Sequence, residues 1–156
     1  MDGSRDAPDI VVLPPVLVGV MMVVGLGIHW FLWQVDLLPM VLARVLGLSI
    51  FVASGLLAHF AHLAFKRVGT NVLPTQPTTA IAVDGPYRYT RNPLYIAAIG
   101  VYLGVTLWVN GLALMLLLPL VAWGLHYGIV LREETYLEAK FGATYSSYRS
   151  RVPRWL

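Results

Sequence analysis

Four long apolar stretches occupy most of this 156-residue chain and leave few folds open to it. They cover residues 10–33, 40–65, 94–109 and 112–131. A helix that crosses the hydrocarbon core of a bilayer needs about 20 apolar residues, so three stretches are long enough and residues 94–109 barely span. Hydrophobic residues make up 58% of the chain and charged residues 12%, against about 25% in soluble domains. The sequence therefore predicts an all-α, polytopic membrane protein with four transmembrane helices, built as a single domain over residues 1–156.

Composition also excludes several classes of function. Eleven basic residues are too few for a nucleic-acid footprint, and the chain has no cysteine to act as a nucleophile or thiolate ligand. His59 and His62 would need further ligands to bind a metal, so we expect no metal site. The acidic N-terminus lacks the positive region of a signal peptide and is interpreted as a retained tail. Nothing in the sequence indicates an obligate protein partner.

Turn and cap residues divide the chain further. Asn110 and Gly111 form a short turn that joins the third and fourth spans into a helical hairpin. Pro14, Pro15 and Pro93 stand where a first helical turn tolerates proline. The fourth helix is expected to continue beyond the membrane to residue 141 and to stop at Gly142, before a short C-terminal helix.

Lysine and arginine are distributed unevenly among the connections. Residues 34–36 and 110–111 contain none, whereas the connection after the second span and the C-terminal tail contain nearly all of them. By the positive-inside rule, both termini and the polar connection are cytoplasmic, which agrees with an even number of spans.

Two polar clusters lie on this predicted cytoplasmic side: residues 85–95, GPYRYTRNPLY, and residues 131–155, LREETYLEAKFGATYSSYRSRVPRW. The hairpin brings the base of the third span beside the end of the fourth, so the clusters can form one site. Cationic, aromatic, amide and carboxylate groups together suit a zwitterionic ligand with an aromatic ring. Two plainer interpretations are an interfacial collar of arginine and tyrosine, and a solvated helix end for Glu133 and Glu134.

His126 precedes Glu133 by seven residues, so a regular helix would place both on one face. A polar residue at membrane depth is a candidate for function. The alternative is a histidine that is hydrogen-bonded between helices.

The ordered motifs from residue 77 to the C-terminus resemble the isoprenylcysteine carboxyl methyltransferase family and its relatives among phospholipid methyltransferases. The resemblance implies an integral membrane enzyme that transfers a methyl group from S-adenosylmethionine to a lipid-like acceptor and releases S-adenosylhomocysteine. The residues that match the family motifs are Arg91, Pro93, Tyr95, Glu133 and Glu134. Asn92 replaces the family histidine, and an asparagine cannot exchange a proton near neutral pH.

The resemblance and the chemistry of the two polar clusters together suggest roles for individual residues. The cofactor-binding set is expected to comprise Tyr87, Arg91, Asn92, Pro93, Tyr95, Glu133, Glu134, Tyr145, Tyr148 and Arg149. Arg91 or Glu134 would also orient the acceptor as the catalytic pair, and the C-terminal helix would close the cofactor pocket. The acceptor is expected to be a prenylcysteine carboxylate, a phospholipid amine or a small apolar molecule, reached from the bilayer, and all three alternatives stay open. Two rival functions stay open: a nicotinamide-dependent membrane reductase and a non-enzymatic scaffold or transport component.

Overall fold

A computed structural model of the chain describes residues 6–71 and 76–156, and all regular structure within them is helical. In chain order the helices are α1 (Pro14–Phe31), α2 (Met40–Val68), α3 (Pro93–Val109), α4 (Leu112–Leu125), α5 (Leu131–Phe141) and α6 (Ala143–Arg151). A 3₁₀ turn, η1 (Gly85–Arg88), precedes α3, and a π-helical segment, η2 (His126–Val130), joins α4 to α5. The predicted all-α class is confirmed.

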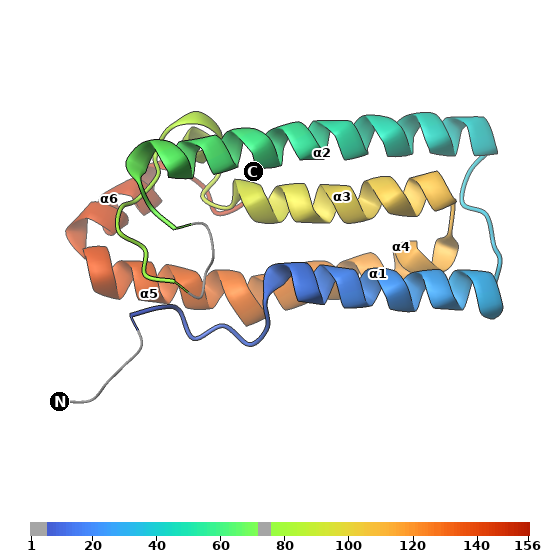
Figure 1. The fold of residues 1–156 in the computed structure, drawn as a ribbon, viewed down its shortest axis with the longest axis horizontal. Helices are drawn as coiled ribbons and strands as arrows, with labels where there is room; N and C mark the ends of the chain where they lie inside the picture. Colours follow the sequence, from blue (N-terminus) through green and yellow to red (C-terminus); the bar gives the residue numbers. More distant parts are fainter. Residues whose placement is uncertain (1–5, 72–75) are drawn as a thin grey trace.

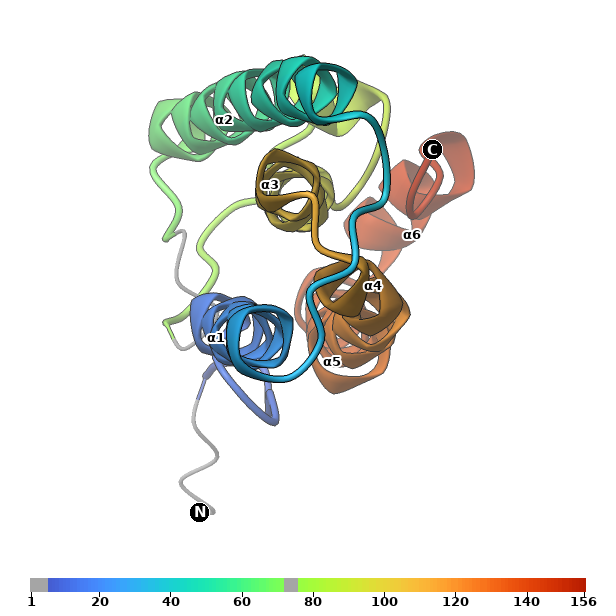
Figure 2. The same cartoon turned by 90° about the vertical axis from the view of Figure 1, so that its right-hand side faces the viewer.

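Helices α1 to α4 run along the long axis of the molecule, and α6 lies at one end (Figure 1). Viewed along that axis, α3 lies between α2 on one side and α1 and α4 on the other (Figure 2). Helix α3 packs most extensively against α2, and α4 packs most extensively against α1. The close approach of α2 and α3 depends on Gly47 and Gly104, because a Cβ atom on Gly47 would lie 2.7 Å from the Gly104 carbonyl oxygen.

The four predicted apolar stretches correspond to helices in the structure, with small differences in their bounds. Three helical segments are apolar and long enough to cross a membrane: Pro14–Phe31, Met40–Val68 and Leu112–Phe141. The helix Pro93–Val109 is apolar but shorter, as its sequence predicts. Prolines stand in the first turns of α1 and α3. A backbone amide in the first turn has no intrahelical acceptor, so the amide hydrogen that proline lacks is not missed there.

The first span begins four residues later than the apolar stretch predicts. Residues 10–13 stay outside α1, and the Val11 amide donates to the carbonyl of Gly128 in η2 at 3.2 Å. Leu13, the residue before the helix, has extended backbone, as a residue that precedes proline prefers. The start of α1 is therefore determined by Pro14 and by this contact with η2.

The α3–α4 hairpin is present, and Asn110 organises it. Asn110 has a left-handed backbone (φ 61°), which asparagine tolerates better than most residues. Its side-chain oxygen accepts hydrogen bonds from the Leu37 and Leu38 amides at 3.1 and 3.0 Å, and its amide group donates to the Leu38 carbonyl at 2.8 Å. These hydrogen bonds join the α3–α4 turn to the connection between α1 and α2.

The fourth helix continues through η2 into α5 and ends at Gly142, whose φ is 50°. The predicted continuation to residue 141 is confirmed. The π-helical segment was not predicted. It widens one turn and changes the angular relation of the residues that flank it, because a π turn pairs residues five apart.

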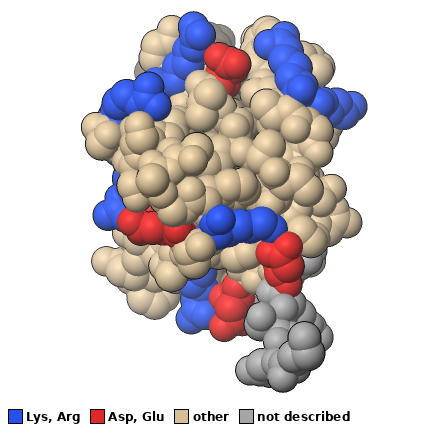
Figure 3. All heavy atoms as spheres, turned by 90° about the vertical axis from the view of Figure 1, so that its left-hand side faces the viewer, with Lys and Arg blue, Asp and Glu red and all other residues tan. Residues whose placement is uncertain are grey.

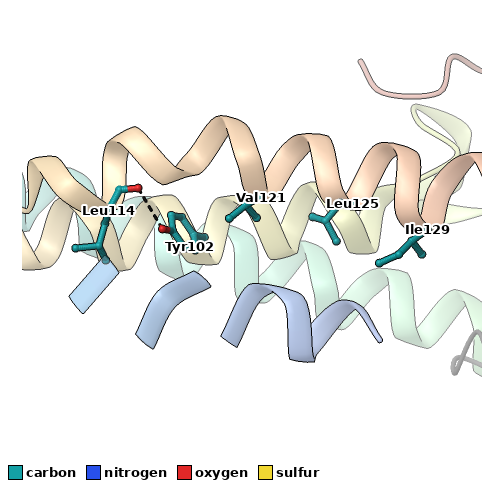
Figure 4. Packing of buried hydrophobic residues seen from close by; sticks show 5 residues of the cluster. All are labelled: Tyr102, Leu114, Val121, Leu125 and Ile129. Carbon is teal, nitrogen blue, oxygen red and sulfur yellow. Dashed lines mark hydrogen bonds between the residues drawn. The ribbon is translucent and has the colours of Figure 1, made fainter. Parts of the chain in front are cut away.

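The core lies between α1, α3 and α4. Its fully buried members are Tyr102, Leu114, Val121, Leu125 and Ile129 (Figure 4). The Tyr102 hydroxyl donates to the Leu114 carbonyl at 3.1 Å, so this buried polar group is satisfied. Many large apolar side chains of α1 and α2 are exposed instead, which fits helices that face lipid. Charged side chains are displayed on the end of the molecule that carries α6 (Figure 3).

Candidate functional site

The segment of residues 85–92 folds into a compact turn beneath α2. Gly85 adopts a φ of 60°, which opens η1, and the Tyr87 ring stacks on Phe65 of α2 with centroids 5.1 Å apart. Pro93 then begins α3, so Arg91 and Asn92 are placed directly before the helix. The Arg91 side chain is only 8% exposed, which is unusual for a charged group.

Glu134 is the centre of a buried ion-pair network. Its carboxylate lies 3.1 Å from Arg91 Nη1 and accepts three hydrogen bonds from the Arg154 guanidinium at 2.9 to 3.1 Å. The Glu134 side chain is 8% exposed, and that of Arg154 is 32% exposed. Two arginines therefore compensate one carboxylate, as a buried charge requires.

Glu133 has different partners from its neighbour. The Tyr95 hydroxyl of α3 donates to Glu133 Oε1 at 2.7 Å. Among the described residues, no arginine or lysine forms an ion pair with Glu133. The two adjacent glutamates thus have distinct electrostatic settings: Glu134 is paired with two arginines, whereas Glu133 is held by a tyrosine hydroxyl.

Helix α6 covers this polar region with two tyrosines. Arg91 Nη1 donates to the Tyr145 hydroxyl oxygen at 3.3 Å, and the Tyr148 hydroxyl donates to the Tyr87 carbonyl at 2.8 Å. Burial raises the pKa of both the Tyr145 and the Tyr148 phenols above the usual value. Both rings therefore stay neutral at physiological pH and offer hydroxyl groups for hydrogen bonding.

A cavity of about 660 Å³ opens beside these side chains. Its polar end is formed by Arg91, Asn92, Glu133 and Glu134, and its remaining walls are mostly apolar. The apolar walls come from α1, α2 and α3 and include Val18, Met22, Ala58, Ala98 and Val101. The volume lies within the range of about 300 to 1,000 Å³ that small-molecule sites occupy.

The structure brings most of the predicted site residues to this cavity. Those that line it are Tyr87, Arg91, Asn92, Tyr95, Glu133, Glu134, Tyr145 and Tyr148. Pro93 is buried at the start of α3 and does not line the cavity. Arg149 also lies away from it, in an ion pair of 2.7 Å with Glu138 in which both side chains are nearly half exposed.

His126 is likewise absent from the cavity lining. Its ring lies 5.8 Å from the ring of Trp155 and contacts Tyr127 edge-on. The predicted common face with Glu133 assumed a regular α-helix, and the intervening π-helical segment breaks that assumption.

Sequence reasoning missed the cavity-lining residues of the connection before η1, such as Asn71 and Thr78, and two further contributors to the site. Arg154 holds Glu134, although the only sequence signal was its place in the tail motif, next to Pro153. The N-terminal segment, residues 6–13, is the second contributor, since Pro8 and Leu13 line the cavity. It is held on α5 by Asp6, whose carboxylate accepts hydrogen bonds from Lys140 at 2.6 and 2.7 Å and from Tyr136 at 2.9 Å.

Comparison with known proteins gives one family and two relatives. A family described as phospholipid methyltransferase matches residues 42–144. Protein-S-isoprenylcysteine O-methyltransferase of Schizosaccharomyces pombe is 34% identical over 95 residues, which cover 60% of this chain and 37% of the yeast protein. A Haemophilus influenzae protein named only as uncharacterized is 35% identical over 63 residues, 40% of this chain and 100% of that protein. The chain thus matches little more than a third of the yeast relative, and no solved structure matches it.

Proposed function

The chain belongs to the phospholipid methyltransferase family, and we propose that it transfers a methyl group from S-adenosylmethionine to a lipid-like acceptor at the cytoplasmic face of a membrane. The observation that carries the proposal is the composition of the cavity. One end presents two carboxylates and an arginine, and the rest is an apolar chamber between helices that face lipid. Such a cavity suits a zwitterionic cofactor beside an apolar acceptor.

The residues at the polar end fit the methionine portion of the cofactor. Arg91 Nε is buried and has no hydrogen-bond partner among the described residues, so a donor is free for a carboxylate. Glu133 forms no ion pair there, so it is suited to an ammonium group. Together they match the opposite charges of an α-amino acid.

Tyrosines supply the second element of the fit. Tyr87, Tyr95, Tyr145 and Tyr148 all line the cavity. A cation near an aromatic face gains about 0.5 to 2 kcal/mol, and the sulfonium of the cofactor is such a cation. Asn92 lines the same end, whereas Pro93 shapes it indirectly by starting α3.

When bound, S-adenosylmethionine supplies an already activated methyl group, so the reaction needs no nucleophilic side chain. The protein aligns the acceptor with the methyl group and keeps water away. Arg91 and Glu134 are fixed by their mutual ion pair and by Arg154, which makes them suited to orienting the polar end of the acceptor. Helix α6 closes the aqueous side through Tyr145 and Tyr148.

The membrane arrangement follows from the same features. We infer four spans, with residues 94–109 as the short third one, and a single domain in which residues 85–95 and 132–156 supply the cofactor site. The concentration of lysine and arginine near that site supports a cytoplasmic orientation for it and for both termini. The apolar walls support an acceptor that enters from lipid, such as a prenylcysteine carboxylate, a phospholipid amine or a small apolar molecule, and the name of the yeast relative includes isoprenylcysteine.

A binding titration tests this function. Detergent-purified protein is titrated by calorimetry with S-adenosylhomocysteine and, separately, with reduced nicotinamide dinucleotide. The proposal predicts saturable binding of the first ligand alone. Arg91→Ala and Glu133→Gln should each weaken binding at least about tenfold, since each removes a charge-assisted contact. Arg149→Ala is the matched control and should bind like the wild type, because Arg149 lies outside the cavity. Binding of the nicotinamide ligand alone would favour a reductase.

A further inference from the structure

The C-terminal segment is fastened to the residues before α3 by a small set of hydrogen bonds. The carbonyl oxygen of Arg154 accepts two of them, from Thr90 Oγ1 at 2.9 Å and from Asn92 Nδ2 at 3.0 Å. The Arg91 amide donates to the Pro153 carbonyl at 3.0 Å. We call Thr90, Asn92 and the Arg154 carbonyl the C-terminal clasp.

The clasp is internally braced and buried. Thr90 Oγ1 also accepts a hydrogen bond from the Asn92 amide at 3.2 Å, so one hydroxyl joins all three residues. Thr90 and Asn92 are 3% and 7% exposed. In such surroundings a lost partner leaves a buried polar group unsatisfied, which is costly.

The side chain of Arg154 contacts the candidate active site. Its guanidinium donates three hydrogen bonds to Glu134, and Glu134 in turn pairs with Arg91. The clasp holds the Arg154 backbone, so it determines where the guanidinium lies. Thr90 is not among the residues that line this cavity, and it is joined to the site by these hydrogen bonds and by its peptide bond to Arg91.

We propose that Thr90 and Asn92 are positioning residues, which hold Arg154 so that its guanidinium fixes Glu134 and Arg91 for cofactor binding. This inference rests on the proposed function. It gives Asn92 a role that needs only a hydrogen-bond donor, and an amide group supplies one without exchanging a proton. It also assigns Arg154 to the site as the link between the clasp and Glu134.

Two variants of Thr90 test the clasp. Thr90→Val keeps the shape but removes the hydroxyl, whereas Thr90→Ser keeps the hydroxyl. Since a net hydrogen bond is worth about 0.5 to 1.5 kcal/mol, Thr90→Val should weaken S-adenosylhomocysteine binding about two- to tenfold. Thr90→Ser should restore most of the affinity. Thr135→Val is the matched control, because the Thr135 hydroxyl bonds to the Leu131 carbonyl on the exposed side of α5.

A double-mutant cycle separates positioning from general stability. Arg154→Gln removes the guanidinium but keeps the backbone carbonyl that the clasp holds. By itself it should weaken binding, and Thr90→Val added to it should cause a smaller loss than in the wild type, because the link from the clasp to Glu134 is already broken. Fully additive losses, or wild-type affinity in Arg154→Gln, would overturn the proposal. The Arg154→Gln result is decisive even if Thr90→Val does not fold.

The outcomes distinguish this inference from the proposed function. If the wild-type protein binds no S-adenosylhomocysteine, the function itself fails. If the wild type binds and Thr90→Val binds equally well, only the clasp is refuted.

Discussion

Glu134→Gln is the substitution for which the structure gives the clearest energetic expectation. The change keeps the side-chain shape but removes the negative charge between Arg91 and Arg154. Arg154 is about one-third exposed and can be hydrated, whereas the Arg91 side chain, at 8% exposure, is left as a buried charge without its ion pair. Removing one partner of a buried pair costs about 3 to 5 kcal/mol. Glutamine still accepts hydrogen bonds, so we expect about 3 kcal/mol.

The assay is thermal unfolding in detergent at one fixed scan rate. For a domain of this size, about 1 kcal/mol shifts the midpoint by about 2 to 4 °C, so Glu134→Gln should lower it by about 10 °C. Glu138→Gln is the matched control on the same helix. Its ion pair with Arg149 is nearly half exposed and should contribute almost nothing.

A second substitution distinguishes the cost of an unpaired buried charge from the cost of changed side-chain packing. Arg91→Met added to Glu134→Gln removes the unpaired cation and should recover part of the lost stability, while cofactor binding stays weak. The reasoning is refuted if Glu134→Gln and Glu138→Gln unfold at the same temperature, or if the double variant is less stable than Glu134→Gln.

Two further predictions concern packing and the acceptor. Gly104→Ala should destabilise the protein, because its Cβ would lie 2.9 Å from the Phe51 amide nitrogen of α2, whereas Gly55→Ala, with no atom within 4 Å, should be tolerated in the same unfolding assay. Gly19→Leu should raise the KM for the acceptor without changing affinity for S-adenosylhomocysteine, because Gly19 lines the apolar part of the cavity and has open space where a side chain would grow. Equal effects on both ligands would contradict that division of the cavity.

The helical plan could be predicted from the sequence because apolar length and proline position are local signals. Pro93 and Asn110 both act where they were expected. The start of α1 was predicted four residues too early, since the Val11 amide bonds to a carbonyl on a distant helix. The π-helical segment left no recognisable pattern either, so the regular helix that was assumed between His126 and Glu133 is absent and His126 does not line the cavity.

The site was predictable to the extent that it follows short motifs. Arg91 lies just before α3, and Glu133 and Glu134 lie just after η2. These positions bring all three residues to one cavity, as the two polar clusters suggested. Arg149 and Arg154 could not be told apart by sequence, because both are cations in the same tail. The chain turns back after α6 and places Arg154, not Arg149, against Glu134. This turn depends on hydrogen bonds from residues 90–92 to the Pro153 and Arg154 carbonyl oxygens.

Methyl transfer itself is the most direct test of the central claim. Membrane vesicles that contain the protein are incubated with S-adenosylmethionine carrying a labelled methyl group, then extracted with organic solvent. The proposed function predicts label in the extracted lipid fraction for the wild type and for Arg149→Ala, and at least about tenfold less for Glu133→Gln. Vesicles with folded wild-type protein that transfer no more label than vesicles without it would contradict the claim.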